Sequence, residues 1–142
     1  MNKTKILLTA FLLCNPLLAN LAMAKNTIED CQNAILNQET IAQSSRCLDG
    51  VIAEVDRELQ TWVNLHTFNL EEKALVNGRY SALKMFKRSQ SNFITFREND
   101  CRWQYLAISP EQGAGLAYKK CYILLSQSRI TELSAISEPE KS

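Results

Sequence analysis

Apolar residues in the second quarter of the chain recur at intervals of three and four, the spacing of one face of an α-helix. No proline occurs between residues 25 and 109, and only Gly50 and Gly78 interrupt this stretch. The pattern predicts a helix from about Ile41 to His66. Its apolar stripe consists of Leu48, Val51 or Ile52, Val55, Leu59, Trp62 and Val63.

A short helix is predicted before this one. Thr27 is followed by an acid at Asp30, which is the spacing of a capping box. Ile28, Cys31, Ala34 and Ile35 then fall on one face, so we expect a helix that ends near Asn37.

Two further helices are predicted after it. Asn69 is the expected cap of a third helix, which bends at Gly78 and reaches about Tyr105. A loop from Ser109 to Gly115 contains one proline and two glycines, and a last helix spans about Leu116–Ile136. The stripe of the third helix consists of Leu75, Ala82, Leu83, Phe86, Phe93 and Ile94.

These elements predict an all-α fold, a small bundle of about four helices that includes one long helix. A hydrophobic fraction of 46% and a charged fraction of 22% are ordinary for a globular protein. The length of 142 residues suits one domain. We therefore expect a single helical domain over residues 25–142.

The first 24 residues have the order of a secretory signal peptide. Lys3 and Lys5 precede an apolar run over residues 6–13, and Ala22-Met23-Ala24 is an A-x-A cleavage site. A membrane anchor is the alternative, but Asn15, Pro16 and Asn20 break the apolar run before it reaches about 20 residues. We expect cleavage after Ala24, a periplasmic or secreted protein, and no stable membrane span afterwards.

Four of the five cysteines follow this segment, and an even number in an exported chain predicts disulfides. Four cysteines allow three pairings. We predict Cys31–Cys47 and Cys101–Cys121, which close two short loops and would each contribute about 3 kcal/mol. A zinc site is disfavoured because the chain has no CxxC pair and one histidine. We expect neither a metal nor a cofactor.

Charge is distributed unevenly along the chain. The net charge of +1 gives no support for a nucleic-acid partner. However, residues 29–72 hold nine acids and two bases, and residues 73–142 hold eleven bases and six acids. We favour the interpretation that the two oppositely charged halves attract each other during folding. The alternative is that the acidic half forms a surface that binds a basic partner.

The sequence lacks the motifs of common catalytic sites. His66 is the one histidine, and we expect a structural role for it at a helix end. Carboxylate pairs such as Glu71 and Glu72 are adjacent, so they face different directions on a helix. Disulfide bonding would remove the thiols as nucleophiles. We therefore expect a protein that is not an enzyme.

The stretch from Leu83 to Cys101 carries the most specific pattern. Phe86, Gln90, Phe93, Arg97 and Cys101 share one helical face. A guanidinium buried beside aromatic rings requires a carboxylate or carbonyl partner. We predict that Asp56 pairs with Arg97, as an intramolecular brace in preference to a ligand site.

This stretch resembles the family of LprI-type lysozyme inhibitors, whose helix reads L-x-x-A-Q-x-A-W-x-x-Y-R-D-x-x-C. Gln90, Arg97 and Cys101 match the motif, while Phe93 and Phe96 stand for its Trp and Tyr. The resemblance extends over about Cys31 to Leu133. Upstream it rests on Cys47, Asp56 and Leu59, with Gln60 in place of an Asn, and downstream on Gly113, Gly115, Cys121, Arg129 and Leu133.

The resemblance implies an envelope protein that binds and inhibits lysozyme or a related muramidase. Animal lysozymes are usually basic, so the acidic first half is compatible with such a partner. The alternatives are an immunity or envelope-stress protein that binds another muramidase or toxin, and an enzyme that acts on the cell wall.

The loop between Cys101 and Cys121 is the predicted contact with that partner. Its candidate residues are Glu111, Gly113, Gly115 and Tyr118. Gly113, Gly115 and Tyr118 have the spacing of the S-G-x-G-x-x-Y loop in a β-barrel class of lysozyme inhibitors, but the serine of that loop is missing. The alternative is that this segment only connects two helices.

Overall fold

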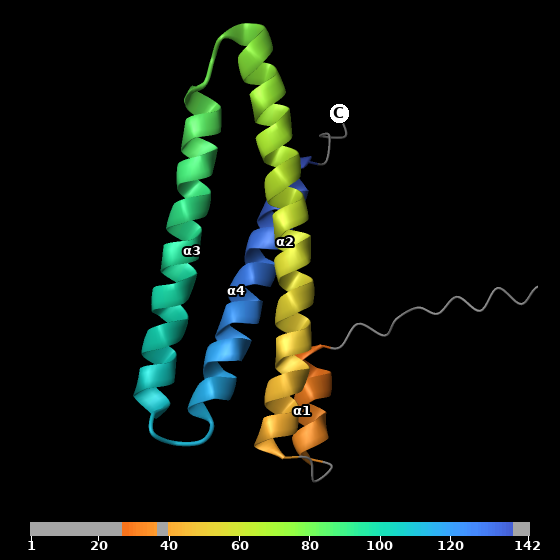
Figure 1. Cartoon of the computed structure of the whole chain (residues 1–142), viewed down its shortest axis with the longest axis vertical. Coiled ribbons are helices and arrows are strands. Elements are labelled where there is room, and N and C mark those ends of the chain that lie inside the picture. Colours follow the sequence, from red (N-terminus) through yellow and green to blue (C-terminus); the bar gives the residue numbers. More distant parts are fainter. Residues whose placement is uncertain (1–26, 37–39, 138–142) are drawn as a thin grey trace, which may run out of the picture.

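The computed structural model describes residues 27–36 and 40–137, and this part of the chain is helical throughout apart from short connections (Figure 1). The predicted signal peptide lies outside the described residues and stays a prediction. The helices are α1 (Ile28–Leu36), α2 (Ile41–Asn77), α3 (Ser81–Ile108) and α4 (Ala114–Ser137). The prediction of an all-α bundle of about four helices is confirmed.

Helix α2 is one continuous helix of 37 residues. Thr40 caps its start, because the Thr40 hydroxyl accepts a hydrogen bond from the Gln43 backbone N–H and the Gln43 side chain accepts one from the Thr40 N–H. Gly78 ends the helix in the left-handed conformation, at φ 67°. The predicted break between His66 and Asn69 is wrong, since Asn69 lies within α2.

The start of α4 also differs from the prediction. The helix begins at Ala114, so Gly115 belongs to its first turn and the connection from α3 is limited to residues 109–113. Backbone hydrogen bonds from Glu111 to Ile108 and from Ala114 to Glu111 close successive turns in this connection. The tight connection places α3 and α4 side by side and antiparallel (Figure 1).

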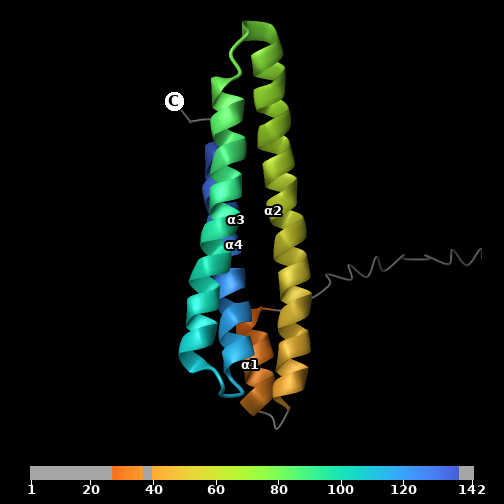
Figure 2. The same cartoon turned by 60° about the vertical axis from the view of Figure 1, so that its left-hand side comes forward.

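Helix α4 lies against both α2 and α3, and α1 packs on the first turns of α2 (Figures 1 and 2). The core is therefore built mainly between α2 and α4, and Phe86 and Phe93 of α3 pack against it. Its fully buried members are Cys31, Leu48, Val51, Val55, Ile123 and Leu133. Within the part of the chain described here, no helix is both long enough and apolar enough to cross a membrane.

Both predicted disulfides are present. Cys31–Cys47 links α1 to α2, and Cys101–Cys121 links α3 to α4. Cys47 lies near the start of α2, Cys101 near the end of α3 and Cys121 near the start of α4. Because α2 and α4 run in one direction and α3 in the other, both disulfides lie at one end of the molecule, which we call the proximal end (Figure 1).

Ion pairs connect the two oppositely charged halves of the sequence. Lys119 pairs with Asp49 at 2.6 Å, Lys87 with Glu71 at 2.9 Å, and Arg97 with Asp56 at 3.6 Å. Each pair joins an acid of α2 to a base of α3 or α4. The interpretation that the two halves attract each other on folding is supported by these three pairs.

Candidate functional site

Arg97 is at the centre of a polar cluster between α2, α3 and α4. Its side chain is only 9% exposed, and Nη1 donates a hydrogen bond of 2.8 Å to the Ser126 hydroxyl. The guanidinium carbon lies 3.8 Å from the centre of the Tyr122 ring and 5.4 Å from that of Phe93. The predicted pair with Asp56 is formed, so a buried cation has an anion, a hydrogen-bond acceptor and two aromatic faces.

Tyr122 connects the two charged members of this cluster. Its hydroxyl donates to the Asp56 carboxylate at 3.0 and 3.2 Å, and its ring lies under Arg97. Burial and the Asp56 carboxylate together raise the pKa of Tyr122 to about 12, against the opposing effect of the Arg97 charge. The phenol therefore stays protonated and donates to Asp56 at any physiological pH.

The structure brings together most of the motif residues named from the sequence. Leu59, Gln90 and Phe93 line one cleft with Asp56 and Arg97. Arg129 of α4 donates to the Gln90 side-chain oxygen at 3.2 Å, which ties this face of α3 to α4. This set holds three helices together and has the character of a structural brace.

Phe96 lies apart from the brace. It occupies the outer side of α3 and is 54% exposed. Position 96 is one residue before Arg97 on a helix, so its side chain is rotated about 100° from the packed face. The motif thus contains one position that the packing of this chain does not use.

Two members of the brace were missed from the sequence, Tyr122 and Ser126. They lie one helical turn apart on α4, and the Ser126 hydroxyl donates to the Tyr122 carbonyl at 2.7 Å. The sequence shows their spacing of four residues, but it does not show that they face Arg97. Helix α4 contacts two helices and carries no single apolar stripe, so no pattern marks the face that packs on the brace.

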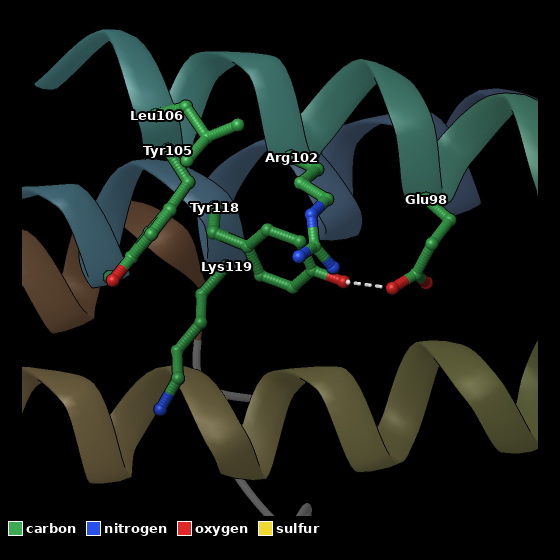
Figure 3. Close-up of a pocket in the computed structure, with 7 residues that line it drawn as sticks. Glu98, Arg102, Tyr105, Leu106, Tyr118 and Lys119 are labelled. Atoms are coloured by element: carbon green, nitrogen blue, oxygen red, sulfur yellow. Dashed lines mark hydrogen bonds between the residues drawn. The ribbon is translucent and has the colours of Figure 1, made fainter. Parts of the chain in front are cut away.

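A separate groove lies at the proximal end between α3 and α4, with a volume of about 370 Å³ (Figure 3). Aromatic and aliphatic side chains form its walls, and charged side chains form its rim. Its lining residues are Glu98, Arg102, Tyr105, Leu106, Gly115, Tyr118 and Lys119.

Polar contacts fix two walls of the groove. The Tyr118 hydroxyl donates to the Glu98 carboxylate at 3.2 Å (Figure 3). Burial, with the nearby charge of Glu98, raises the pKa of the Tyr118 hydroxyl. Lys119 points toward α2, where its ammonium group contacts Asp49 and the Ser45 hydroxyl at 2.6 and 2.7 Å. These side chains are positioned before any partner binds.

The predicted contact residues divide between the groove and the connection beside it. Gly115 and Tyr118 lie on α4 and line the groove. Glu111 and Gly113 lie on the exposed connection before α4 and do not line it. Tyr105, Leu106 and Arg102 complete the groove from α3. The sequence does not mark these three residues, because a groove between two helices depends on how the helices pack and not on the spacing along either one.

His66 takes a structural position. It lies in the middle of α2, not at a helix end as predicted, and its Nε2 is 2.8 Å from the Leu133 carbonyl of α4. Its ring also packs 5.6 Å from the Phe86 ring. Residues 27–36 and 40–137 contain no group of three or more histidine, cysteine or acidic side chains arranged to hold a metal.

Taken together, the four helices, the two disulfides and the buried arginine brace define a small, disulfide-linked helical-bundle protein. A family model described as "Lysozyme inhibitor LprI" matches residues 31–133, which is more than half of the chain. The chain belongs to the LprI lysozyme inhibitor family. No curated protein matches it, and no solved structure does either.

Proposed function

We propose that this protein is an exported inhibitor that binds lysozyme, or a related muramidase, and protects the bacterial cell wall without catalysing a reaction. Membership of the LprI family carries this proposal. Two disulfides support a periplasmic or secreted location, because such bonds persist in oxidising compartments. The proposed signal peptide over residues 1–24 would deliver the chain there.

The groove is the proposed contact surface for lysozyme. Tyr105, Leu106 and Tyr118 offer aromatic and aliphatic walls, and Arg102 lies at the rim. Buried aromatic residues surrounded by a polar rim are typical of protein interfaces, and tyrosine and arginine contribute most of the affinity in many of them. The exposed Glu111 and Gly113 extend this surface along the connection.

Charge at the proximal end favours a basic partner. Helix α1 and the first half of α2, residues 28–36 and 41–60, lie beside the groove and hold six acids against two bases. Asp49 is neutralised by Lys119 and Asp56 lies close to Arg97. The net negative charge of these two segments attracts a basic enzyme over a distance of about one Debye length, which raises the association rate more than the affinity.

The proposal is tested by lysis of cell-wall substrate. Purified chain starting at Lys25, with intact disulfides, should stop lysis at stoichiometric amounts across part of a panel of animal lysozymes and bacterial muramidases. Inhibition restricted to a bacterial muramidase would support the immunity role. No inhibition of any panel member at large excess contradicts the proposal, and turnover of peptidoglycan by the chain alone would indicate an enzyme.

A matched pair of variants locates the contact surface. Tyr105→Ala removes an exposed groove residue and should weaken inhibition about 30-fold, as expected for an interfacial tyrosine. Tyr80→Ala removes an equally large exposed ring just before the start of α3, far from the groove, and should leave inhibition unchanged. Equal inhibition constants for the two variants would exclude the groove as the contact surface.

A further inference from the structure

Among residues 27–36 and 40–137, the end of the molecule opposite the disulfides consists of the hairpin of α2 and α3 alone. His66 of α2 lies beside Leu133 of α4, and α4 ends four residues later at Ser137. Helix α2 continues to Asn77 before the chain turns back into α3. The last turns of α2 and the first turns of α3 therefore extend beyond α4 (Figures 1 and 2). We call residues 68–88 the distal tip.

Large apolar side chains are exposed on the distal tip. Leu75 is 75% exposed and Val76 is 79% exposed, the highest values among the large apolar side chains described. Phe68, Tyr80 and Met85 are each more than half exposed as well. On α2 the positions of Phe68, Leu75 and Val76 lie opposite the face that carries buried Leu59 and Ala74. Five large apolar side chains are thus exposed within the 18 residues from Phe68 to Met85, and such a concentration marks a surface that binds a protein or a membrane.

The distal tip also carries an excess of basic side chains. The distal tip contains five bases and two acids, and one acid, Glu71, is neutralised by Lys87. Within the described residues, no acid forms an ion pair with the other bases of the tip. These bases are Lys73, Arg79, Lys84 and Arg88.

We propose that the distal tip docks on a bilayer surface that is rich in anionic phospholipid. Apolar side chains combined with lysine and arginine are the features of segments that lie in the interfacial region of such a bilayer. Tyr80, an aromatic residue with a polar end, suits the same interfacial region. The tip would insert shallowly and would not cross the membrane.

The charge of the distal tip disfavours the other occupants. A basic lysozyme would be repelled by it, and two copies of the tip would repel each other. The proximal groove lies at the opposite end of α3, so a chain docked on a bilayer leaves the proposed lysozyme site free. The two surfaces can thus be tested independently.

Vesicle co-sedimentation tests the proposal with the chain that starts at Lys25. It should bind vesicles of equal parts phosphatidylglycerol and phosphatidylcholine at low ionic strength, bind pure phosphatidylcholine much more weakly, and be released by high salt. Replacing Leu75 and Val76 together by serine should weaken binding about tenfold. Arg79→Gln and Lys84→Gln should each weaken it about fivefold.

The controls use the opposite end of the molecule. Leu106→Ser and Arg102→Gln change one apolar and one basic residue of the groove and should leave vesicle binding unchanged. Absence of binding to anionic vesicles at low ionic strength overturns the proposal, and so does equal binding by the tip variants. A dimer in sedimentation velocity that the tip substitutions dissociate, or loss of lysozyme inhibition in the tip variants, would assign the surface to a protein and overturn it as well.

Discussion

Replacing Arg97 by alanine removes the centre of the brace between the three long helices. The variant loses a charge-assisted hydrogen bond to Ser126, which contributes about 1.5 kcal/mol. It loses the stacking of the guanidinium on Tyr122 at 3.8 Å, which contributes about 1 kcal/mol. Asp56 is 44% exposed, so its ion pair with Arg97 adds only about 0.5 kcal/mol. We expect a loss of about 3 kcal/mol in the free energy of unfolding.

Urea unfolding followed by far-ultraviolet circular dichroism, with both disulfides intact, measures this loss. Arg97→Lys keeps the charge but not the planar group, so it should recover less than half of the lost stability. Arg88→Ala removes an exposed arginine of the same helix and should change stability by no more than about 0.5 kcal/mol. An Arg97→Ala variant within about 1 kcal/mol of the parent, at an unchanged m-value, would refute the brace.

Three further predictions concern pH, backbone conformation and the disulfides. The pKa of Tyr122 is higher in the folded protein than the ordinary value of 10, so stability should fall as pH rises from about 10 to about 12. Tyr122→Phe should abolish that fall in thermal melts. An identical pH profile for both proteins would contradict this prediction. A Cβ meets nothing within 4 Å at Gly78 or Gly50, so backbone conformation alone decides the effect of alanine at each position. Gly78→Ala should lower the free energy of unfolding by about 1 kcal/mol because φ is 67°, whereas Gly50→Ala inside α2 should raise it by about 0.5 kcal/mol. Changes of the same sign would disprove the left-handed conformation at Gly78. Replacing Cys101 and Cys121 together by serine should lower the free energy of unfolding by about 3 kcal/mol in chemical denaturation, and an unchanged midpoint would argue against that disulfide as a stabilising link.

The error at Asn69 shows how local signals compete in a long helix. Asn69, Glu71 and Glu72 have the composition of a helix start, and His66 that of a helix end. Packing of α2 against α4 around His66, and against α3 farther along, where Ala74 is buried, overrides these weak preferences. The stronger signal was Gly78, where the chain adopts a conformation that only glycine takes readily.

The groove illustrates a different limit. Tyr105, Leu106 and Tyr118 come from two helices, and no spacing in the chain indicates that they face a common hollow. Their positions depend on the antiparallel packing of α3 on α4 and on the short connection between Ile108 and Ala114. Gly115 and Tyr118 were identified from the sequence because, with Gly113, they have the G-x-G-x-x-Y spacing of a loop in another class of lysozyme inhibitors.

Local physical chemistry, which can be read in the sequence, determined the helical class, the capping of α1 by Thr27 and Asp30, the disulfide pairing and the pairing of Asp56 with Arg97. Each depends on the spacing of residues along the chain or on the need of a buried charge for an oppositely charged partner. Only the tertiary structure decided that α4 contacts both other long helices, that Tyr122 and Ser126 complete the brace, and that the distal tip extends beyond α4. These features depend on the lengths and relative register of helices distant in sequence, which packing fixes and no local pattern encodes.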